Sequence, residues 1–206
     1  MPDQDLPALF CKPKNDGSTY ETLFQRDLHD IGKISFRSLK LDSDLSMIHD
    51  WVNREYSRAF WQMNGSRDLL ESTYKNILCD PHSHSFIGSL NGQPTCQIDL
   101  YQVLVDELRS HVNAEDNDCG LHLLMSPPNQ RKKDTTPLFF KTFLAFYFSF
   151  PEAERMFGEP DRENIKSNNL VTDTGFKFIK QIELSYKTAN LYCLTKTQFY
   201  AAHQTS

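Results

Sequence analysis

Two histidines and one aspartate occupy positions where acid–base chemistry is to be expected. His82 and His84 lie two positions apart at the start of a β-like run, and Asp118 comes directly before a short apolar run. An imidazole donates or accepts a proton near neutral pH, and partial burial raises the pKa of a carboxyl group towards a value useful for a base. The residues also fit a structural role, in which Asp118 caps a turn and at least one histidine lies at the surface.

A second group of residues has the chemistry of a phosphate site. Arg131, Lys132 and Lys133 come just before an apolar segment that is predicted to form a helix. The free N–H groups and the dipole of a helix start, combined with nearby cations, bind phosphate groups. A basic triplet alone also fits a solvated loop. The phosphate-site interpretation therefore depends on the position of the triplet, after a predicted strand and before a predicted helix.

Acidic residues are concentrated between the histidines and Asp118. They are Asp99, Asp106, Glu107, Glu115 and Asp116, and the stretch contains one basic residue, Arg109. If part of this stretch lines a substrate channel, it would suit a substrate with a remote ammonium group rather than a carboxylate. The alternative is a solvated face, which is the commoner role of a charge run.

Composition and charge exclude several classes of protein. The chain has 206 residues, a formal net charge of −5 and 39% hydrophobic residues, enough for one well-packed core. No apolar run reaches the roughly 18–20 residues of a membrane span, and an acidic chain without a basic stripe is a poor nucleic-acid binder. Five scattered cysteines show no metal or redox spacing. We therefore expect a cytoplasmic protein with no metal site, no membrane contact and no nucleic-acid partner.

The pattern of apolar residues predicts alternating strands and helices after an N-terminal arm or short hairpin over residues 1–30. Residues 31–200 are expected to form one domain. Asn91-Gly92 between two β-like runs is typical of a tight type I′ hairpin, and residues 137–150, apolar nearly all round, predict a buried helix. Asp42-Ser43-Asp44 and Asp161 offer N-caps for two further helices, and Gly175 offers a C-terminal stop. The order β-α-α-β-β-β-α-β-α-β-β indicates an α/β fold with a mixed central sheet flanked by helices.

Several segments, in this order, resemble one group of proteins. They are HDWVN followed by Phe60-Trp61, DPHSHSFIG at 80–88, DCGLHLL at 118–124 and EPDREN at 159–164, followed by Leu170 and Gly175-Phe176. Together they resemble the siderophore-biosynthesis N-acyltransferases of the GNAT superfamily, relatives of the aerobactin-pathway N-hydroxylysine acetyltransferase and the mycobactin lysine acyltransferase. The resemblance covers about residues 45–195.

The resemblance implies an acyl-CoA-dependent enzyme. Its acceptor would be a small-molecule hydroxylamine, either an N-hydroxy-diamine or N6-hydroxylysine, and its product a hydroxamate for iron chelation. A siderophore synthetase of the same pathway is a possible partner. The resemblance implies Asp118 as the proton acceptor and His82 as the second catalytic residue, with His84 not separable from it. His84, Asp99 and Tyr101 are expected to bind substrate.

The same resemblance implies where acyl-CoA binds as co-substrate, with no permanently bound cofactor. Met125 and Ser126 end the strand with which the pantetheine arm pairs, Arg131, Lys132 and Lys133 face its phosphates, and Asn164 reaches the arm. The loop before the helix lacks the usual glycines, and Val171 stands where many GNAT enzymes carry a tyrosine acid. A GNAT enzyme for another acceptor, such as an aminoglycoside, and a non-catalytic acyl-CoA-binding module stay open. The acyl group, acetyl or succinyl, also stays open.

Overall fold

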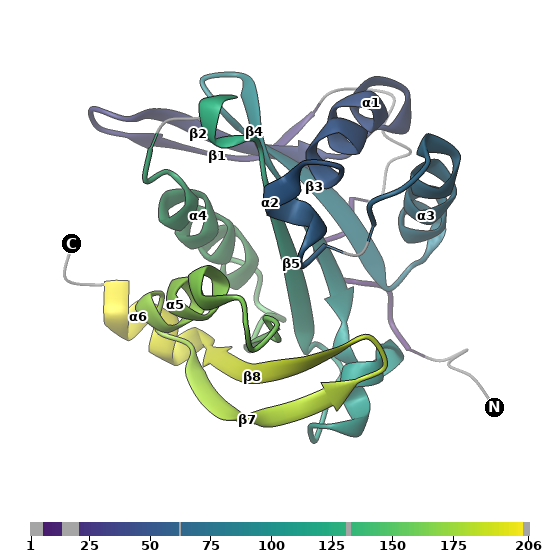
Figure 1. Ribbon diagram of the computed structural model, residues 1–206. Helices are drawn as coiled ribbons and strands as arrows, with labels where there is room; N and C mark the ends of the chain where they lie inside the picture. The colour runs from purple at the N-terminus through teal and green to yellow at the C-terminus, as the bar shows by residue number, and fades with distance from the viewer. Residues whose placement is uncertain (1–5, 14–20, 62, 131–132, 204–206) are drawn as a thin grey trace. The chain divides into compact units, whose positions relative to one another are not determined.

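The protein folds as a mixed α/β structure with eight strands and six α-helices in the part of the chain that can be described (Figure 1). The structure is a computed structural model that describes residues 6–13, 21–61, 63–130 and 133–203. The strands are β1 (Thr22–Leu28), β2 (Gly32–Ser38), β3 (Ser83–Leu90), β4 (Gln93–Gln102), β5 (Cys119–Met125), β6 (Arg155–Gly158), β7 (Lys177–Leu184) and β8 (Lys187–Thr195).

The four predicted helices occur in the predicted order, and two further helices, Glu55–Arg58 and Lys196–His203, were not predicted. The helices are α1 (Leu41–Val52), α2 (Glu55–Arg58), α3 (Arg67–Cys79), α4 (Thr136–Phe148), α5 (Ile165–Asp173) and α6 (Lys196–His203), with short 3-10 turns at Val103–Val105, Glu107–Ser110 and Pro128–Gln130. Within the described ranges, no helix is both long and apolar enough to cross a lipid bilayer.

Strand pairing confirms the predicted mixed sheet. The strand order is β1-β2-β3-β4-β5-β6-β8-β7. The β1–β2, β2–β3, β6–β8 and β7–β8 pairs are antiparallel, and β5 and β6 are parallel. The β5–β6 register contains two residue pairs, Cys119 with Met156 and Gly120 with Phe157. The last five residues of β5 come after the last of these pairs along the strand.

The chain divides into two compact units, which are described separately. The β1–β4 unit contains Lys12–Asp99 and His122–Phe146, and the β6–β8 unit contains Met1–Cys11, Leu100–Leu121 and Tyr147–Ser206. Both β4 and β5 contribute residues to both units.

In the β1–β4 unit, helices cover both faces of the strands. Figure 1 shows α1 and α3 on one side of β3 and β4 and α4 on the other. Ile34 and Phe36 of β2 are fully buried and alternate with more exposed residues, as a half-buried strand requires. The helix α4 is buried nearly all round, and its Phe143 packs edge-on against Phe36 and Phe86. The predicted core helix is therefore confirmed.

The turn between β3 and β4 is the one predicted from Asn91-Gly92. Asn91 and Gly92 have φ of 51° and 81°, the left-handed conformation that a type I′ turn requires at both central positions. The Asn91 side chain also accepts a hydrogen bond from the Lys33 backbone N–H at 2.8 Å. This contact fixes the hairpin to the neighbouring strand.

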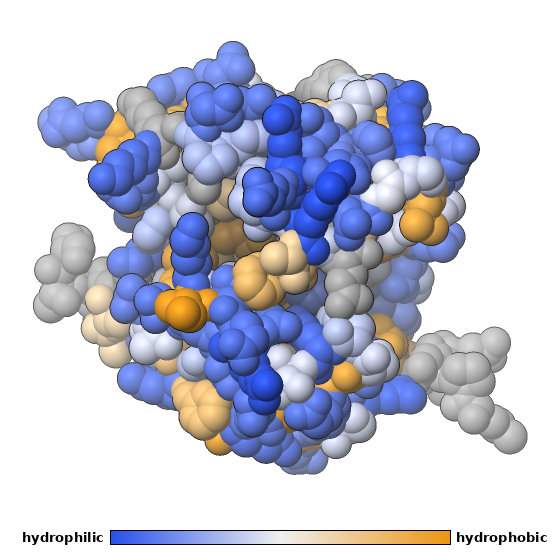
Figure 2. Space-filling view, in the orientation of Figure 1, coloured by the Kyte–Doolittle hydropathy of each residue, from blue (hydrophilic) through white to orange (hydrophobic). Residues whose placement is uncertain are grey.

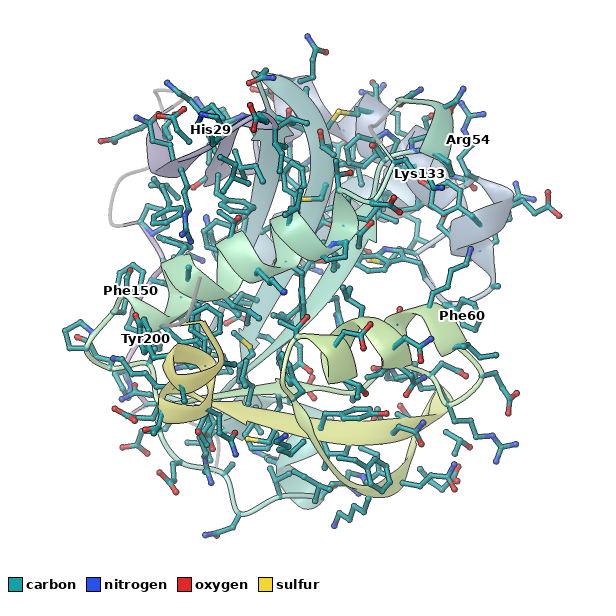
Figure 3. The ribbon with its side chains drawn as sticks, turned by 90° about the vertical axis from the view of Figure 1, so that its left-hand side faces the viewer. His29, Arg54, Phe60, Lys133, Phe150 and Tyr200 are labelled. Carbon is teal, nitrogen blue, oxygen red and sulfur yellow. The ribbon has the colours of Figure 1, made fainter. Side chains whose placement is uncertain are left out.

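In the β6–β8 unit, a second core lies beside the β7–β8 hairpin. It includes Phe157, Ile182 and Leu191. The C-terminal helix α6 contacts the end of α4 through the Tyr200 hydroxyl, which donates to the Phe148 carbonyl at 3.1 Å, and Figure 3 shows Tyr200 on the same side as Phe150. Gly175 follows α5 with φ of +104°, as predicted for a helix stop.

The predicted N-cap of α1 is wrong. The helix begins one residue before the Asp42-Ser43-Asp44 segment, with Lys40 at the N-cap and no side-chain cap. Asp44 is instead buried, accepts a hydrogen bond from the Lys40 backbone N–H at 2.9 Å and forms an ion pair with Arg37 at 2.7 Å. A buried carboxylate needs such a partner, and the partner comes from β2, which local sequence does not reveal.

The predicted N-cap of α5 is wrong as well. Asn164 occupies the N-cap, and its side-chain oxygen accepts a hydrogen bond from the Ser167 backbone N–H at 3.1 Å. Asp161 stabilises the preceding turn by accepting from the Glu163 N–H at 2.8 Å. Asn and Asp are both good caps, so the sequence alone did not separate them.

Candidate functional site

A buried carboxylate with few partners lies at the centre of the β1–β4 unit. Asp99 of β4 is 7% exposed. Its Oδ1 accepts hydrogen bonds from the Ser85 hydroxyl and the Gln97 side-chain amide, and no described residue donates a hydrogen bond to its Oδ2. Burial raises the pKa of Asp99 from 3.8 to about 6, against the opposing effects of Ser85, His122 and Gln97. Asp99 is therefore a carboxyl group that titrates close to neutral pH.

Two buried polar groups near Asp99 have no hydrogen-bond partner among the described residues. Tyr74 of α3 is fully buried, and its hydroxyl has no hydrogen-bond partner among the described residues. Burial and the nearby Asp99 charge raise the pKa of Tyr74 well above its ordinary value. The Gln97 carbonyl oxygen is likewise without a partner within the described chain. We call Tyr74, Ser85, Gln97, Asp99 and His122 the Asp99 cluster.

Local sequence rules explain how these side chains meet. Gln97 and Asp99 are two positions apart on one strand and so point to the same face. Tyr74 belongs to the apolar stripe of α3, which packs in a core that includes Ile87 and Leu124. His122 of β5 packs edge-on against Trp61, with 6.0 Å between ring centroids. The cluster is thus a group of polar side chains beside an apolar core.

His84, a predicted substrate-binding residue, is buried elsewhere in the same unit. Its Nε2 is 2.9 Å from the Ser38 hydroxyl, its ring packs against Phe86, and its Nδ1 has no partner among the described residues. Burial, followed by the charge of Lys12, lowers the pKa of His84 to about 4. His84 is therefore neutral at physiological pH. It neighbours Ser85 along β3, so the two side chains point to opposite faces of the strand.

His82 lies in the turn before β3. Its backbone N–H donates to the Asp80 carboxylate at 2.9 Å, and its side chain is partly buried. It belongs to the β1–β4 unit, whereas Asp118 belongs to the β6–β8 unit. Its catalytic role stays a prediction.

Asp118, the predicted base, has strong partners in the β6–β8 unit. It is 2% exposed. Arg155 of β6 donates to Oδ1 at 2.8 Å and to Oδ2 at 2.5 Å, and the Glu115 backbone N–H donates to Oδ2 at 2.8 Å. The Arg155 guanidinium therefore engages both oxygens of the Asp118 carboxylate. This arrangement fits a residue that fastens the preceding loop to β6, and the catalytic role of Asp118 stays a prediction.

Tyr101, predicted to bind substrate, also lies in the β6–β8 unit. Its hydroxyl forms a hydrogen bond with Glu159, and its pKa is raised well above the ordinary value by burial and then by the Glu159 charge. Glu159 is 3% exposed and lies 3.7 Å from the Lys187 ammonium. The Tyr101 ring occupies the space that a side chain at position 120 would fill, so Gly120 permits its approach.

Of the predicted cofactor residues, Met125 is the last residue of β5 and Ser126 directly follows the strand. The Met125 carbonyl accepts a hydrogen bond from the Tyr56 hydroxyl at 2.7 Å. The Ser126 backbone N–H donates to the Thr95 carbonyl at 2.8 Å, and the fully buried Ser126 hydroxyl has no partner in the described ranges. An unpaired buried hydroxyl is available to a ligand.

The structure describes only some of the other residues predicted to bind the cofactor. Lys133 is exposed on the loop before α4 (Figure 3), where a cation can meet a phosphate. Arg131 and Lys132 lie outside the described residues. Asn164 uses its side-chain oxygen as the α5 N-cap, so a contact with a pantetheine arm would involve its amide N–H groups. The face in Figure 2 is mainly hydrophilic, with hydrophobic side chains in small separate patches.

Three residues near the site were not among the predicted site residues. They are His122, Tyr74 and Tyr56. A histidine in an otherwise apolar β5 was the available indication for His122. Nothing in the sequence shows that the Tyr74 hydroxyl lacks a partner, because that depends on which side chains α3 meets.

A family comparison agrees with this geometry. The model of the acetyltransferase (GNAT) domain matches residues 40–184. The chain belongs to the GNAT acetyltransferase family. It is therefore an N-acyltransferase with acyl-CoA as co-substrate, and solved structures with this fold include complexes with coenzyme A. The family, the fold class, the enzyme class and the co-substrate predicted from the sequence are confirmed.

Individual GNAT relatives cover most of the chain. It is 28% identical over 167 residues to the N-hydroxyputrescine acetyltransferase of Acinetobacter baumannii, covering 81% of this chain and 79% of that protein. It is 24% identical over 153 residues to the lysine N-acyltransferase of Mycobacterium tuberculosis, covering 74% and 73%. The solved structure of an uncharacterized protein from Bacillus halodurans matches with a TM-score of 0.82 and 26% identity, covering 86% and 92%.

Proposed function

We propose that this GNAT enzyme transfers an acyl group from acyl-CoA to the nitrogen of an N-hydroxylated amine, giving a hydroxamate for siderophore biosynthesis. The observation that carries the proposal is the similarity, over 81% of the chain, to a relative named for N-hydroxyputrescine. The buried polar Asp99 cluster supports it, because an amine acceptor needs hydrogen-bond acceptors and negative charge. The alternative acceptor of this kind is N6-hydroxylysine.

The reaction needs little from the protein. The hydroxylamine nitrogen attacks the thioester carbonyl carbon, the C–S bond breaks, and the nitrogen loses a proton while the CoA thiolate gains one. A hydroxylamine is far less basic than an amine and is largely neutral near pH 7, so the base collects the proton as the tetrahedral intermediate forms. Positioning and donors for the oxyanion supply the remaining stabilisation.

Two assignments of the base can be tested against each other. The first is Asp118 with His82. The second is His122, whose charge interacts with buried Asp99 and whose strand also carries the predicted pantetheine-binding end. The second assignment is favoured by the contacts of Arg155, which occupy both oxygens of the Asp118 carboxylate.

Kinetics of matched variants separate these assignments. If Asp118 is the base, Asp118→Ala lowers kcat by about 10²–10⁴-fold while CoA binding survives, and Arg155→Met leaves kcat within about threefold. If Asp118 only fastens the loop, both variants lose thermal stability to a similar extent, and His122→Ala shows the large loss of kcat instead. Unchanged turnover in Asp118→Ala removes Asp118 from the mechanism.

Acyl-CoA is proposed to lie along the end of β5. Five residues of β5 follow its last pair with β6, and in GNAT enzymes the pantetheine arm pairs with the backbone of this strand. Met125, the unpaired Ser126 hydroxyl and Lys133 supply groups for the arm and phosphates, and Arg131, Lys132 and Asn164 remain proposed contacts. Tyr56 would compete for or share the Met125 carbonyl, which has two lone pairs.

A free-thiol release assay tests the proposed function. Acetyl-CoA and succinyl-CoA are each combined with N-hydroxycadaverine, N6-hydroxylysine, cadaverine and kanamycin. We expect thiol release with an N-hydroxylated acceptor at a kcat/KM at least about tenfold above that of cadaverine, together with formation of a ferric-binding hydroxamate. Faster release with kanamycin would favour an aminoglycoside acceptor, and no release with any pair would favour a non-catalytic acyl-CoA-binding module. A siderophore synthetase that consumes the hydroxamate is the proposed partner.

A further inference from the structure

The Asp99 cluster contains hydrogen-bond acceptors that the protein leaves unused. Both protein donors to Asp99 converge on Oδ1, and Oδ2 receives none from the described residues. The Gln97 carbonyl oxygen and the Tyr74 hydroxyl are also without partners there, and both side chains are fully buried. Buried polar groups are normally paired, so two unpaired buried groups beside one buried carboxylate indicate a missing hydrogen-bond donor.

The orientation of Gln97 is fixed by the same contacts. Its amide nitrogen donates to the Asp99 carboxylate, and exchanging the amide atoms would place two oxygens against each other. The carbonyl oxygen therefore faces away from that contact as an acceptor. No lysine or arginine of the described chain forms an ion pair with Asp99, and the charge of His122 opposes the effect of burial on its pKa.

A primary ammonium group matches this arrangement. It carries one positive charge and three N–H donors and has no acceptor. A carboxylate would be repelled by Asp99 and would find no donor at Gln97 Oε1. The surrounding core, with Ile87 and Leu124, suits a methylene chain, because apolar surface removed from water stabilises the complex.

We propose that Asp99, Gln97 and Tyr74 form a subsite for the terminal ammonium of the acceptor. The subsite selects an N-hydroxy-diamine over N6-hydroxylysine, because the α-carboxylate of the amino acid would lie next to Asp99. This inference rests on the proposed function for the identity of the reacting end, whereas the ammonium site itself is independent of the chemistry at that end.

Binding measurements test the subsite without requiring turnover. Isothermal titration calorimetry compares N-hydroxycadaverine with N-pentylhydroxylamine, which has the same chain length but lacks the ammonium, on the wild-type protein, Asp99→Asn and Tyr74→Phe. We expect the wild type to bind N-hydroxycadaverine about 30-fold or more tightly than N-pentylhydroxylamine, the scale for a desolvated charge pair. Asp99→Asn should reduce this ratio to about threefold or less, and Tyr74→Phe should reduce it by about three- to tenfold.

Each outcome has a defined meaning. A ratio that is the same in the wild type and Asp99→Asn overturns the subsite and shows that ordered water or another group fills the cluster. The Tyr74→Phe protein, whose lost hydroxyl has no partner, provides the answer if Asp99→Asn does not fold. Asp99-dependent binding of N-hydroxycadaverine with no thiol release supports the subsite and refutes the proposed function. Thiol release at equal kcat/KM from both hydroxylamines supports the function and refutes the subsite.

Discussion

Replacing Asp99 by asparagine is expected to make the stability of the protein less sensitive to pH. Asparagine has the shape of aspartate, and its carbonyl oxygen can keep both hydrogen bonds that converge on Asp99 Oδ1. The substitution therefore removes the ionisable group while preserving its known contacts. The new amide N–H groups add a stability term that does not change with pH.

The magnitude follows from the pKa of Asp99. Burial raises it from 3.8 to about 6, so the folded state holds this proton more tightly than the unfolded state. The stabilising effect of the proton is full below pH 4 and is lost as the pH rises through about 6. The difference corresponds to about 3 kcal/mol in total, of which about 2 kcal/mol falls between pH 4.5 and 7.5.

Urea unfolding followed by circular dichroism checks this prediction. The free energy of unfolding of Asp99→Asn, relative to the wild type, should become about 2 kcal/mol more favourable between pH 4.5 and 7.5. Asp27→Asn, at an exposed position of β1, serves as the control for loss of one negative charge. A relative stability that does not change with pH would refute the reasoning, because it would mean that Asp99 ionises in the folded state without a desolvation cost.

Three further predictions concern stability and are measured by thermal and urea unfolding. Tyr74→Phe should leave the free energy of unfolding unchanged or raise it, because its hydroxyl has no partner among the described residues. Tyr147→Phe should lower the free energy of unfolding by about 1–2 kcal/mol, because its hydroxyl donates to a backbone carbonyl oxygen. Equal losses in the two variants would contradict this prediction. Gly120→Ala should lower the free energy of unfolding by about 1–3 kcal/mol, since the new methyl group overlaps the Tyr101 ring, and an unchanged midpoint would show that the ring moves freely. Lys12→Met should lower it by about 2–3 kcal/mol, because the ammonium donates to the backbone carbonyls of Leu78, Asp80 and Ser83. A smaller loss would mean that water replaces these hydrogen bonds.

The fold was largely predictable because most of its helices, strands and turns depend on local sequence. The buried helix α4, the alternation in β2 and the Asn91-Gly92 turn each depend on residues a few positions apart. The two N-cap predictions were wrong because the partners of these residues depend on the fold. Asp44 forms its ion pair with Arg37 on strand β2. Asn164 caps α5 in place of Asp161, which accepts a hydrogen bond in the preceding turn.

The candidate site was predictable in its residue types but not in their partners. The sequence indicated His82, His84 and Asp118 as the acid–base residues of interest and Asp99 as a substrate-binding residue. It could not show that Asp118 would pair with Arg155, 37 positions away, or that His84 would be buried and neutral. His122 and Tyr74 were not predicted as site residues, because a polar residue in an apolar segment is usually structural. Its role becomes visible only when its neighbours in the fold are known.

The sequence by itself determined the family, the order of strands and helices and the hairpin turn, since these follow from periodicity, turn chemistry and motifs in a fixed order. Only the tertiary structure decided which charges are paired and which are buried alone. Asp118 and Asp99 are the same chemical group, yet the first forms an ion pair with Arg155 and the second is buried without an ion pair to a lysine or arginine of the described residues. The pKa of a carboxyl group depends on its solvation and on the charges around it, and these are properties of the folded chain.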